Sequence, residues 1–322
     1  GAGGERDGAM TSRGQSRHWR ELDLGGVPGP HAGDAPGLDD VREAPATSGI
    51  TVASSFTAPE TAFGLLTGAE RVWAVGAVFA DVHRLHALHR ALWPRIRRND
   101  RLVYLGNMIG RGAAILETID QLLEFRIAFL ARPHADPEHL VYLRGAQEEM
   151  WQKLLQLQFA PDPPEVMRYL LANGVAPTIR SYGGDPERAM MVAREGAVSL
   201  TRWTNLLRMA VRSRPGHEPF FAALKRAAYT GENGVLFVSA GLDPARPLRL
   251  QKDRFWWEAD GFARLEGPYQ GFARVVRGHD PAHGGIHHNE WCTTLDGGCG
   301  YDGTLVAACF APDGAILDVI EV

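Results

Sequence analysis

The chain has 322 residues, of which 45% are hydrophobic and 22% are charged, and its formal net charge is −4. This balance is typical of soluble globular proteins and argues against nucleic acid as a partner, because no basic excess is present. No run of about 18 apolar residues occurs, which excludes a membrane span. The three cysteines, Cys292, Cys299 and Cys309, are too few for a disulfide framework. These features favour a cytoplasmic protein.

Residues 1–65 differ from the rest of the chain. They are rich in glycine and proline and show little apolar periodicity. Such a segment cannot bury enough surface to offset its ordering entropy, so we expect a flexible tail. Residues 1–9 precede Met10 and are interpreted as an addition to the natural sequence. One folded domain is predicted over residues 66–322.

Strands and helices alternate in the first half of this domain. Short apolar runs predict strands at residues 72–76, 102–106 and 140–143. Apolar residues at helical spacing predict helices at residues 85–96, 114–130 and 147–157. Strand–helix alternation is typical of parallel sheets. Farther along, residues 163–228 are mostly helical, and further strands are predicted at 235–238, 274–277, 291–295, 305–310 and 316–320.

Glycine-rich segments follow five of these strands, at the edge where open α/β sheets bind ligands. They are residues 76–80 (GAVFA), 106–112 (GNMIGRG), 144–150 (RGAQEEM), 239–241 (SAG) and 277–281 (RGHDP). In order and spacing they resemble the GDxHG, GDxxDRG, RGNHE, HAG and HGHTP motifs of the bacterial PPP-type serine/threonine protein phosphatases, within the calcineurin-like metallophosphoesterases. The resemblance runs from about residue 71 to 307. It includes Asn173-Gly174 and Ser181-Tyr182-Gly183 in a helical insert and Asp296-Gly297-Gly298 near the end.

The resemblance implies a fold and a chemistry. The fold would be α+β, a four-layer α/β/β/α sandwich of two mixed β-sheets flanked by helices, with a helical insert at about residues 160–230. The chemistry would use two divalent metal ions about 3.5–4 Å apart, which hold phosphate and activate a water molecule. Such ions need carboxylate and imidazole ligands.

This chain departs from the family at most positions that carry the chemistry. The family's metal ligands and general acid are replaced by Ala77, Phe79, Asn107, Ala146, Gln147 and Ser239. Gly110 stands where the family has the aspartate that supports its general acid, and only His279 keeps a family ligand. We therefore expect no catalytic residue, no metal site and no cofactor, with Mn, Fe or Zn held weakly if at all. The chain resembles a pseudophosphatase.

The arginines of these segments indicate a different use of the site. Arginine is well suited to bidentate phosphate binding. Two arginines match family positions and one is new. Together with two neighbours, they are the predicted phosphate-binding residues: Arg111, Arg144, Arg277, His279 and Asn107. In the alternative interpretation, the arginines pair with nearby carboxylates such as Glu148 or Asp280.

Two other patterns allow more than one interpretation. Asp81 and His83 offer a second D-x-H that could supply metal ligands in a shifted register, although the first turn of a helix explains them more simply. The segment with His279, His283, His287, His288, Cys292 and Cys299 could bind a soft metal, but its spacing matches no zinc pattern. A loop followed by the start of a strand is the simpler interpretation.

The sequence thus favours a phosphatase-like protein that binds a protein partner or a phosphorylated ligand, in a regulatory or scaffold role. The alternative is an active metal-dependent phosphatase with an atypical site, acting on phosphoproteins or dinucleoside polyphosphates. An apolar helix face around Trp203, Leu206 and Met209 is expected to pack within the insert or to form a partner surface.

Overall fold

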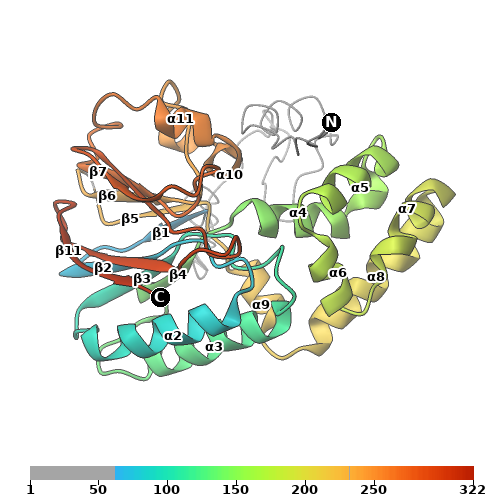
Figure 1. Cartoon of the computed structure of the whole chain (residues 1–322), viewed down its shortest axis with the longest axis horizontal. Helices are drawn as coiled ribbons and strands as arrows, with labels where there is room; N and C mark the ends of the chain where they lie inside the picture. The colour runs from blue at the N-terminus through green and yellow to red at the C-terminus, as the bar shows by residue number, and fades with distance from the viewer. Residues whose placement is uncertain (1–61, 232) are drawn as a thin grey trace, which may run out of the picture.

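The computed structural model describes residues 62–231 and 233–322 (Figure 1). Most of the predicted tail therefore lies outside the described residues. Its last residues lie inside them and correct the predicted domain boundary: strand β1 (Phe63–Leu65) pairs in parallel with β5 (Ala227–Tyr229). The folded part thus includes residues before Leu66.

Five strands form the first sheet, in the order β11-β10-β2-β3-β4. Their bounds are β2 Arg71–Val75, β3 Asp100–Tyr104, β4 Leu140–Tyr142, β10 Val306–Phe310 and β11 Ile316–Glu321. Strands β2, β3 and β4 are parallel, whereas β10 is antiparallel to both of its neighbours. The parallel strand–helix repeat predicted for the first half of the domain is confirmed.

Six strands form the second sheet, in the order β1-β5-β6-β7-β9-β8. The bounds not yet given are β6 Val235–Val238, β7 Arg274–Arg277, β8 Gly285–His288 and β9 Cys292–Asp296. Strands β6, β7 and β9 are parallel, whereas β5 is antiparallel to β6 and β8 is antiparallel to β9. Both sheets are therefore mixed.

Buried side chains of the strands form three apolar layers, one between the sheets and one on the outer face of each sheet. In β2, Val72 and Ala74 belong to the core between the sheets, while Trp73 and Val75 belong to the core under the helices. This follows from the strand period of two, which points successive side chains to opposite faces. Phe237 and Phe310 join the sheets, with ring centroids 5.9 Å apart.

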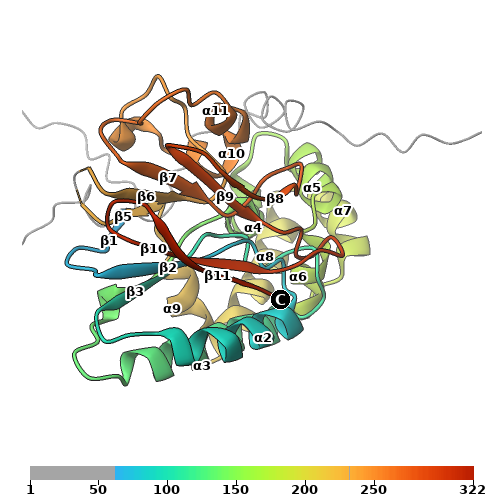
Figure 2. The same cartoon turned by 60° about the vertical axis from the view of Figure 1, so that its left-hand side comes forward.

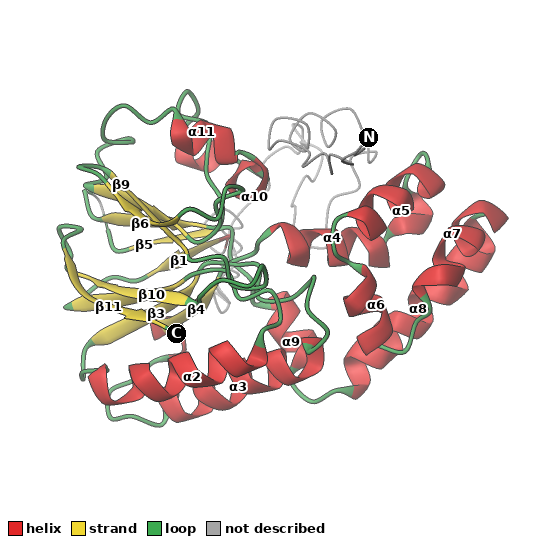
Figure 3. Cartoon of the chain, viewed as in Figure 1, coloured by secondary structure: helices red, strands yellow, loops and turns green. Residues whose placement is uncertain are grey.

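Helices cover the outer face of each sheet (Figures 2 and 3). Helices α2 (Val82–Leu92) and α3 (Ile115–Leu130) lie under the five-stranded sheet. The short α10 (Arg254–Trp257) and α11 (Ala259–Ala263) lie over the six-stranded sheet. The predicted α+β sandwich of two mixed sheets flanked by helices is confirmed.

A group of helices projects beside the sandwich as a separate lobe (Figure 1). It contains α5 Pro163–Ala172, α6 Ala176–Ser181, α7 Pro186–Glu195 and α8 Ala197–Ser213, and α4 (Ala146–Leu155) leads into it from the sandwich. The short α9 (His217–Ala222) follows α8 back to the sandwich, where it lies beside α3. Asp162 and Asp185 cap α5 and α7 by accepting hydrogen bonds from backbone N–H groups, just before a proline at the first helical position. Most of these helices fall in the range predicted for the insert. Short 3-10 helices occur at Trp93–Arg95, Pro137–His139, Leu157–Phe159 and Leu248–Leu250.

Several elements are not predicted by the sequence pattern. Strands β1 and β5 have three residues each, too few to show alternation, and β8 carries exposed histidines at a sheet edge. Helices α10 and α11 have four and five residues. Their short length explains why no periodic signal is visible.

The described part of the chain contains no helix with the length and apolar character that a bilayer crossing needs. All three cysteines are buried free thiols. Burial raises the pKa of Cys292 to about 11 and the pKa values of Cys299 and Cys309 to about 12. These thiols are therefore protonated at neutral pH and poor metal ligands or nucleophiles.

Candidate functional site

The five glycine-rich segments meet at one edge of the sandwich. The backbone N–H of Ala77 donates to the Gly278 carbonyl at 3.1 Å, which joins the two sheets. A Cβ atom at Gly106 would lie 2.7 Å from both the Ser239 hydroxyl oxygen and the Gly145 nitrogen. Gly106 also has a φ of 83°. Only glycine fits both the space and the backbone angle, so this residue lets the segments approach one another.

Asn107 connects the segment after β3 to the start of α4. Its side chain is 1% exposed, and its Oδ1 accepts a hydrogen bond from the Gln147 backbone N–H at 3.0 Å. Gln147 in turn donates through Nε2 to the Asn173 carbonyl of the insert at 2.7 Å. The oxygen of Asn107 is therefore committed to the N-terminus of α4.

Glu148 holds the same loop through its carboxylate, which is completely buried. Oε1 accepts from the N–H groups of Met108 and Ile109 at 2.7 and 3.2 Å. Oε2 accepts from those of Asn107 and Gly145 at 2.9 and 2.8 Å. Burial raises the pKa of Glu148 above its ordinary value, against the opposing effect of these backbone hydrogen bonds. The buried carboxylate of Glu148 thus fixes the backbone after β3 relative to the start of α4.

Phe79 fills space beside the one retained family ligand. Its ring packs edge-on against His279 and Tyr301, with centroid distances of 5.6 and 5.5 Å. Only 3% of the residue is exposed, and its backbone has a φ of 48°. An apolar ring therefore occupies the position that belongs to an imidazole ligand in the family pattern.

The residues present do not fit a dinuclear metal centre. Ala77, Phe79 and Ala146 have no side-chain atom that can coordinate a cation, and Asn107 Oδ1 already accepts a hydrogen bond. The buried Ser239 hydroxyl has no hydrogen-bond partner in the described part of the chain. A pair of divalent ions would need several charged oxygen or imidazole ligands. These positions do not supply them.

The second D-x-H has a structural role. Asp81 is the N-cap of α2, and its Oδ1 accepts from the Arg84 N–H at 3.0 Å. The same carboxylate lies 3.3 Å from the Arg84 guanidinium. The simpler interpretation, polar residues at the first turn of a helix, describes this arrangement.

Two of the predicted phosphate-binding arginines contact carboxylates instead. Arg144 forms an ion pair with Glu149 at 2.8 Å and also contacts Gln152. The buried Arg277 lies 3.4 Å from Asp280 and donates to the Thr294 hydroxyl at 3.0 Å. These contacts correspond to the alternative interpretation of the arginines, in which they pair with carboxylates. Asp280 takes part as that interpretation expects, whereas the partner of Arg144 is Glu149 and not Glu148.

Arg111 differs from the other two arginines. It is exposed, and its guanidinium carbon lies 4.1 Å above the ring centroid of Tyr301. Its backbone N–H donates to the Gly174 carbonyl at 2.9 Å, which fixes the base of the side chain against the insert. Within residues 62–231 and 233–322, no acidic side chain forms an ion pair with Arg111. This guanidinium is available for an anion.

His279 and His283, two members of the segment for which the sequence leaves a soft-metal site open, form a cluster with Asp296, which the sequence analysis does not include in that segment. Its Nδ1 lies 3.3 Å from Asp296 Oδ2, and Nδ1 of His283 lies 2.9 Å from the same oxygen. Burial opposes ionisation of Asp296, but the two imidazoles and the Asp280 N–H hold its pKa below the ordinary value. The ring of Tyr301 lies 3.9 Å from that of His283, between the cluster and Arg111.

The signal for this cluster lies in the strand register. Strands β7 and β9 are parallel, and Arg277 pairs with Thr294. His279 and Asp296 each follow two residues later, so they emerge at the same edge of the sheet. The predicted strand at residues 291–295 ends next to Asp296, but its neighbour in the sheet is not visible from the sequence.

No protein-family model matches the chain, and no curated protein matches it by sequence. Among solved structures, it is similar to a protein provisionally assigned as a diadenosine tetraphosphatase, with 21% identity, 79% of this chain and 94% of that protein covered, and a TM-score of 0.47. A serine/threonine phosphatase from Saccharomyces cerevisiae has 12% identity, 78% of each chain covered and a TM-score of 0.45. A metallophosphoesterase from Sphaerobacter thermophilus has 13% identity, 79% and 88% covered, and a TM-score of 0.39. None of these structures transfers a substrate or a site residue to this chain.

Proposed function

We propose that this chain is a phosphatase-like pseudoenzyme that binds a phosphorylated ligand or the phosphorylated segment of a protein partner. The site around Arg111 would hold the phosphate without hydrolysing its ester. The observation that carries this proposal is the availability of Arg111, whose exposed guanidinium stacks on Tyr301. Around it, the positions that match family ligands have lost their coordinating side chains, except His279.

The chemistry of the neighbouring positions supports binding without turnover. Hydrolysis by the family's route needs a metal-activated water and a general acid. Here Ala77 and Ala146 supply no ligand, and Gln147 cannot donate a proton as an acid does. Its amide instead donates a hydrogen bond to the Asn173 carbonyl. Positive charge and hydrogen-bond donors remain, and these are sufficient for recognition.

The geometry of Arg111 suits a dianionic oxygen group. Stacking on Tyr301 restrains the guanidinium plane, so less side-chain entropy is lost when it binds. The planar fork of the guanidinium can then donate two parallel hydrogen bonds to phosphate oxygens. A lysine at the same position would keep the charge but lose the fork.

Calorimetric titration of the full chain with a phosphoserine peptide tests the proposal. Arg111→Ala is expected to weaken binding at least about tenfold, and Arg111→Lys to weaken it less, in line with a charge-assisted hydrogen-bond pair. Arg202→Ala is the matched control, because Arg202 is an exposed arginine on α8. Unchanged binding in Arg111→Ala, or hydrolysis of p-nitrophenyl phosphate by the manganese-loaded chain, would sink the proposal.

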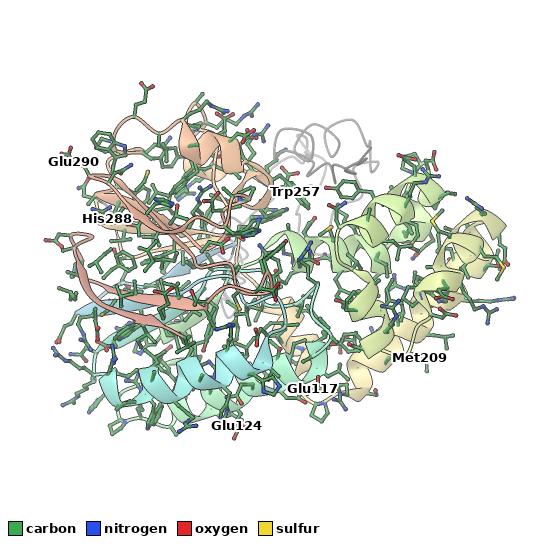
Figure 4. The ribbon with its side chains drawn as sticks, in the orientation of Figure 1. Glu117, Glu124, Met209, Trp257, His288 and Glu290 are labelled. Atoms are coloured by element: carbon green, nitrogen blue, oxygen red, sulfur yellow. The ribbon has the colours of Figure 1, made fainter. Side chains whose placement is uncertain are left out.

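One face of α8 favours a second candidate function, the binding of an unmodified protein partner. Val198, Leu206 and Met209 are 67%, 65% and 63% exposed. Their spacing places them on one side of the helix, and Met209 projects outward from the insert (Figure 4). Leu206→Glu together with Met209→Glu should abolish binding of such a partner while leaving peptide binding at Arg111 unchanged.

A further inference from the structure

Three potential metal ligands converge at the end of the six-stranded sheet. His279 follows β7, His283 lies in the loop before β8, and Asp296 is the last residue of β9. Their ligand atoms all lie within 4.8 Å of one another. Both imidazole Nδ1 atoms face the same carboxylate oxygen, at 3.3 and 2.9 Å. Two of the three residues have no counterpart among the family ligands that the sequence motifs imply.

We propose that His279, His283 and Asp296 bind a single zinc ion. Zinc is bound by imidazole nitrogen and carboxylate oxygen at about 2.0–2.2 Å, so neighbouring ligand atoms of a tetrahedral site lie about 3.3 Å apart. The observed separations of 2.9 and 3.3 Å are close to this value. Magnesium and calcium prefer sets made of oxygen alone, which makes them poorer matches to two imidazoles.

The surroundings of Asp296 hold its carboxylate in a fixed orientation. Its side chain is 1% exposed, and both oxygens accept backbone hydrogen bonds: Oδ2 from the Asp280 N–H at 2.8 Å and Oδ1 from the Gly298 N–H at 2.9 Å. Hydrogen bonds of this kind orient a metal ligand before the ion binds, and they contribute to the metal affinity of natural sites. Little rearrangement of the carboxylate is therefore needed.

The imidazole of His279 adds an independent observation. Its Nδ1 is buried and faces Asp296 Oδ2 at 3.3 Å, but this contact lacks the geometry of a well-formed hydrogen bond, and no other described residue supplies one. A buried polar nitrogen without a partner is costly, because it has lost its hydrogen bonds to water. An ion shared with Asp296 would satisfy this nitrogen. A plain histidine–carboxylate hydrogen bond accounts fully for His283, at 2.9 Å, and less well for His279, whose contact is longer and poorly aligned.

Three protein ligands leave a fourth position open, as in catalytic zinc sites. Tyr301 contacts both the His283 ring and the Arg111 guanidinium. An anion bound at Arg111 could therefore place one oxygen on the ion. This last step rests on the function proposed above, whereas the zinc site itself does not.

Zinc binding by the full chain tests the site directly. The chain is first stripped with EDTA and titrated with zinc chloride, and bound zinc is counted after dialysis. We expect one zinc ion per chain. His283→Asn and Asp296→Asn should each weaken binding at least about 100-fold, since even contacts behind the ligands contribute about 10–100-fold. His283 has a backbone φ of 48°, and asparagine replaces it because asparagine tolerates such left-handed angles better than most residues.

His288→Ala is the matched control in the same segment. His288 pairs with Thr293 at the start of β9, at the opposite end of that strand from Asp296, and it lies at the outer side of the sheet (Figure 4). Zinc binding by this variant should be unchanged. Circular dichroism of each variant separates a lost site from a lost fold, and His283→Asn, in a loop, keeps the test open if Asp296→Asn does not fold.

The outcomes distinguish this inference from the proposed function. Absence of zinc binding, or binding that survives both substitutions, would overturn the zinc site and leave phosphate binding at Arg111 untouched. Tetrahedral coordination is checked by loading cobalt(II) and recording its visible absorption, which His283→Asn should eliminate. Preferential binding of magnesium over zinc would also contradict the site, because its ligands are mainly imidazoles.

Discussion

The two sheets contribute unequally to the site. The segments after β2, β3 and β4 bring Phe79, Asn107 and Gln147, and their contacts are apolar packing and hydrogen bonds within the protein. The segments after β7 and β9 bring His279 and Asp296, whose polar atoms converge on one point. The same edge of one sandwich thus has one half closed by its own side chains and one half able to coordinate an ion.

The difference shows that the conformation of a loop and the supply of metal ligands can come from different residues. In the first half, Glu148 holds the loop after β3 through three backbone N–H groups and joins it to Gly145 through a fourth, so protein groups alone fix this loop. In the second half, the carboxylate of Asp296 is held by backbone groups but still faces two imidazoles. Backbone support and ligand supply are therefore separable properties.

The largest expected change in the free energy of unfolding comes from the half of the site that is filled by Phe79. Phe79→Ala should lower the free energy of unfolding by about 3–4 kcal/mol, because it removes a buried ring and leaves a cavity between His279 and Tyr301. Chemical denaturation measures this change. Phe159→Ala is the control, since Phe159 is 59% exposed and should cost well under about 1 kcal/mol. Equal effects of the two substitutions would show that Phe79 does not close the site.

A smaller loss of stability is expected when the buried carboxylate of Glu148 is replaced. Glu148→Gln leaves one oxygen as an acceptor and puts an NH₂ group against the N–H donors that the other oxygen served. We expect a loss of about 2–3 kcal/mol, measured as above, because two buried donors lose their acceptor.

Glu138→Gln is the control for that substitution, since Glu138 is exposed. It should leave stability within about 0.5 kcal/mol of the parent. A Glu148→Gln variant as stable as the parent would mean that the loop after β3 does not depend on this carboxylate.

The smallest effect expected for a single change of condition, about 1.4 kcal/mol for one pH unit, concerns acid sensitivity under the first sheet. His89 is buried under the first sheet, with ring nitrogens bound to Tyr104 and Gln121. Burial lowers its pKa to about 3, below the unfolded value of about 6.5. Between these values the unfolded state binds more protons, so His89 reduces stability as the pH falls from about 6.5 towards 3.

The measurement is stability as a function of pH in the parent and in His89→Gln, which stays neutral. Across this window the parent should lose up to about 1.4 kcal/mol more per pH unit than the variant. Parallel pH profiles would show that His89 is not the residue through which acid destabilises the first sheet.

Much of the fold follows from local sequence. The run Val72–Val75 and the helical spacing of Leu85, Leu88 and Leu92 carry enough periodic signal to predict β2 and α2. The three-residue strands β1 and β5 carry too little signal. They form because the neighbouring strands offer backbone partners, which is a property of the assembled sheet.

The site was less predictable than the fold, for a physical reason. Motif spacing suffices to select Arg111 and His279, because both directly follow predicted strands or turns. The partnership of His279 with Asp296 depends on β7 lying next to β9, while β8 goes to the sheet edge. Strand order is set by packing of the whole sheet, and a single sequence does not reveal it.

The number of divalent ions bound per chain tests the contrast between the two halves most directly. Native mass spectrometry of the full chain, loaded with manganese and zinc together, gives that number. We expect one ion, lost in Asp296→Asn, because among residues 62–231 and 233–322 the second half alone brings three potential ligands together. Two ions per chain would contradict this picture, since the first half would then also hold a metal.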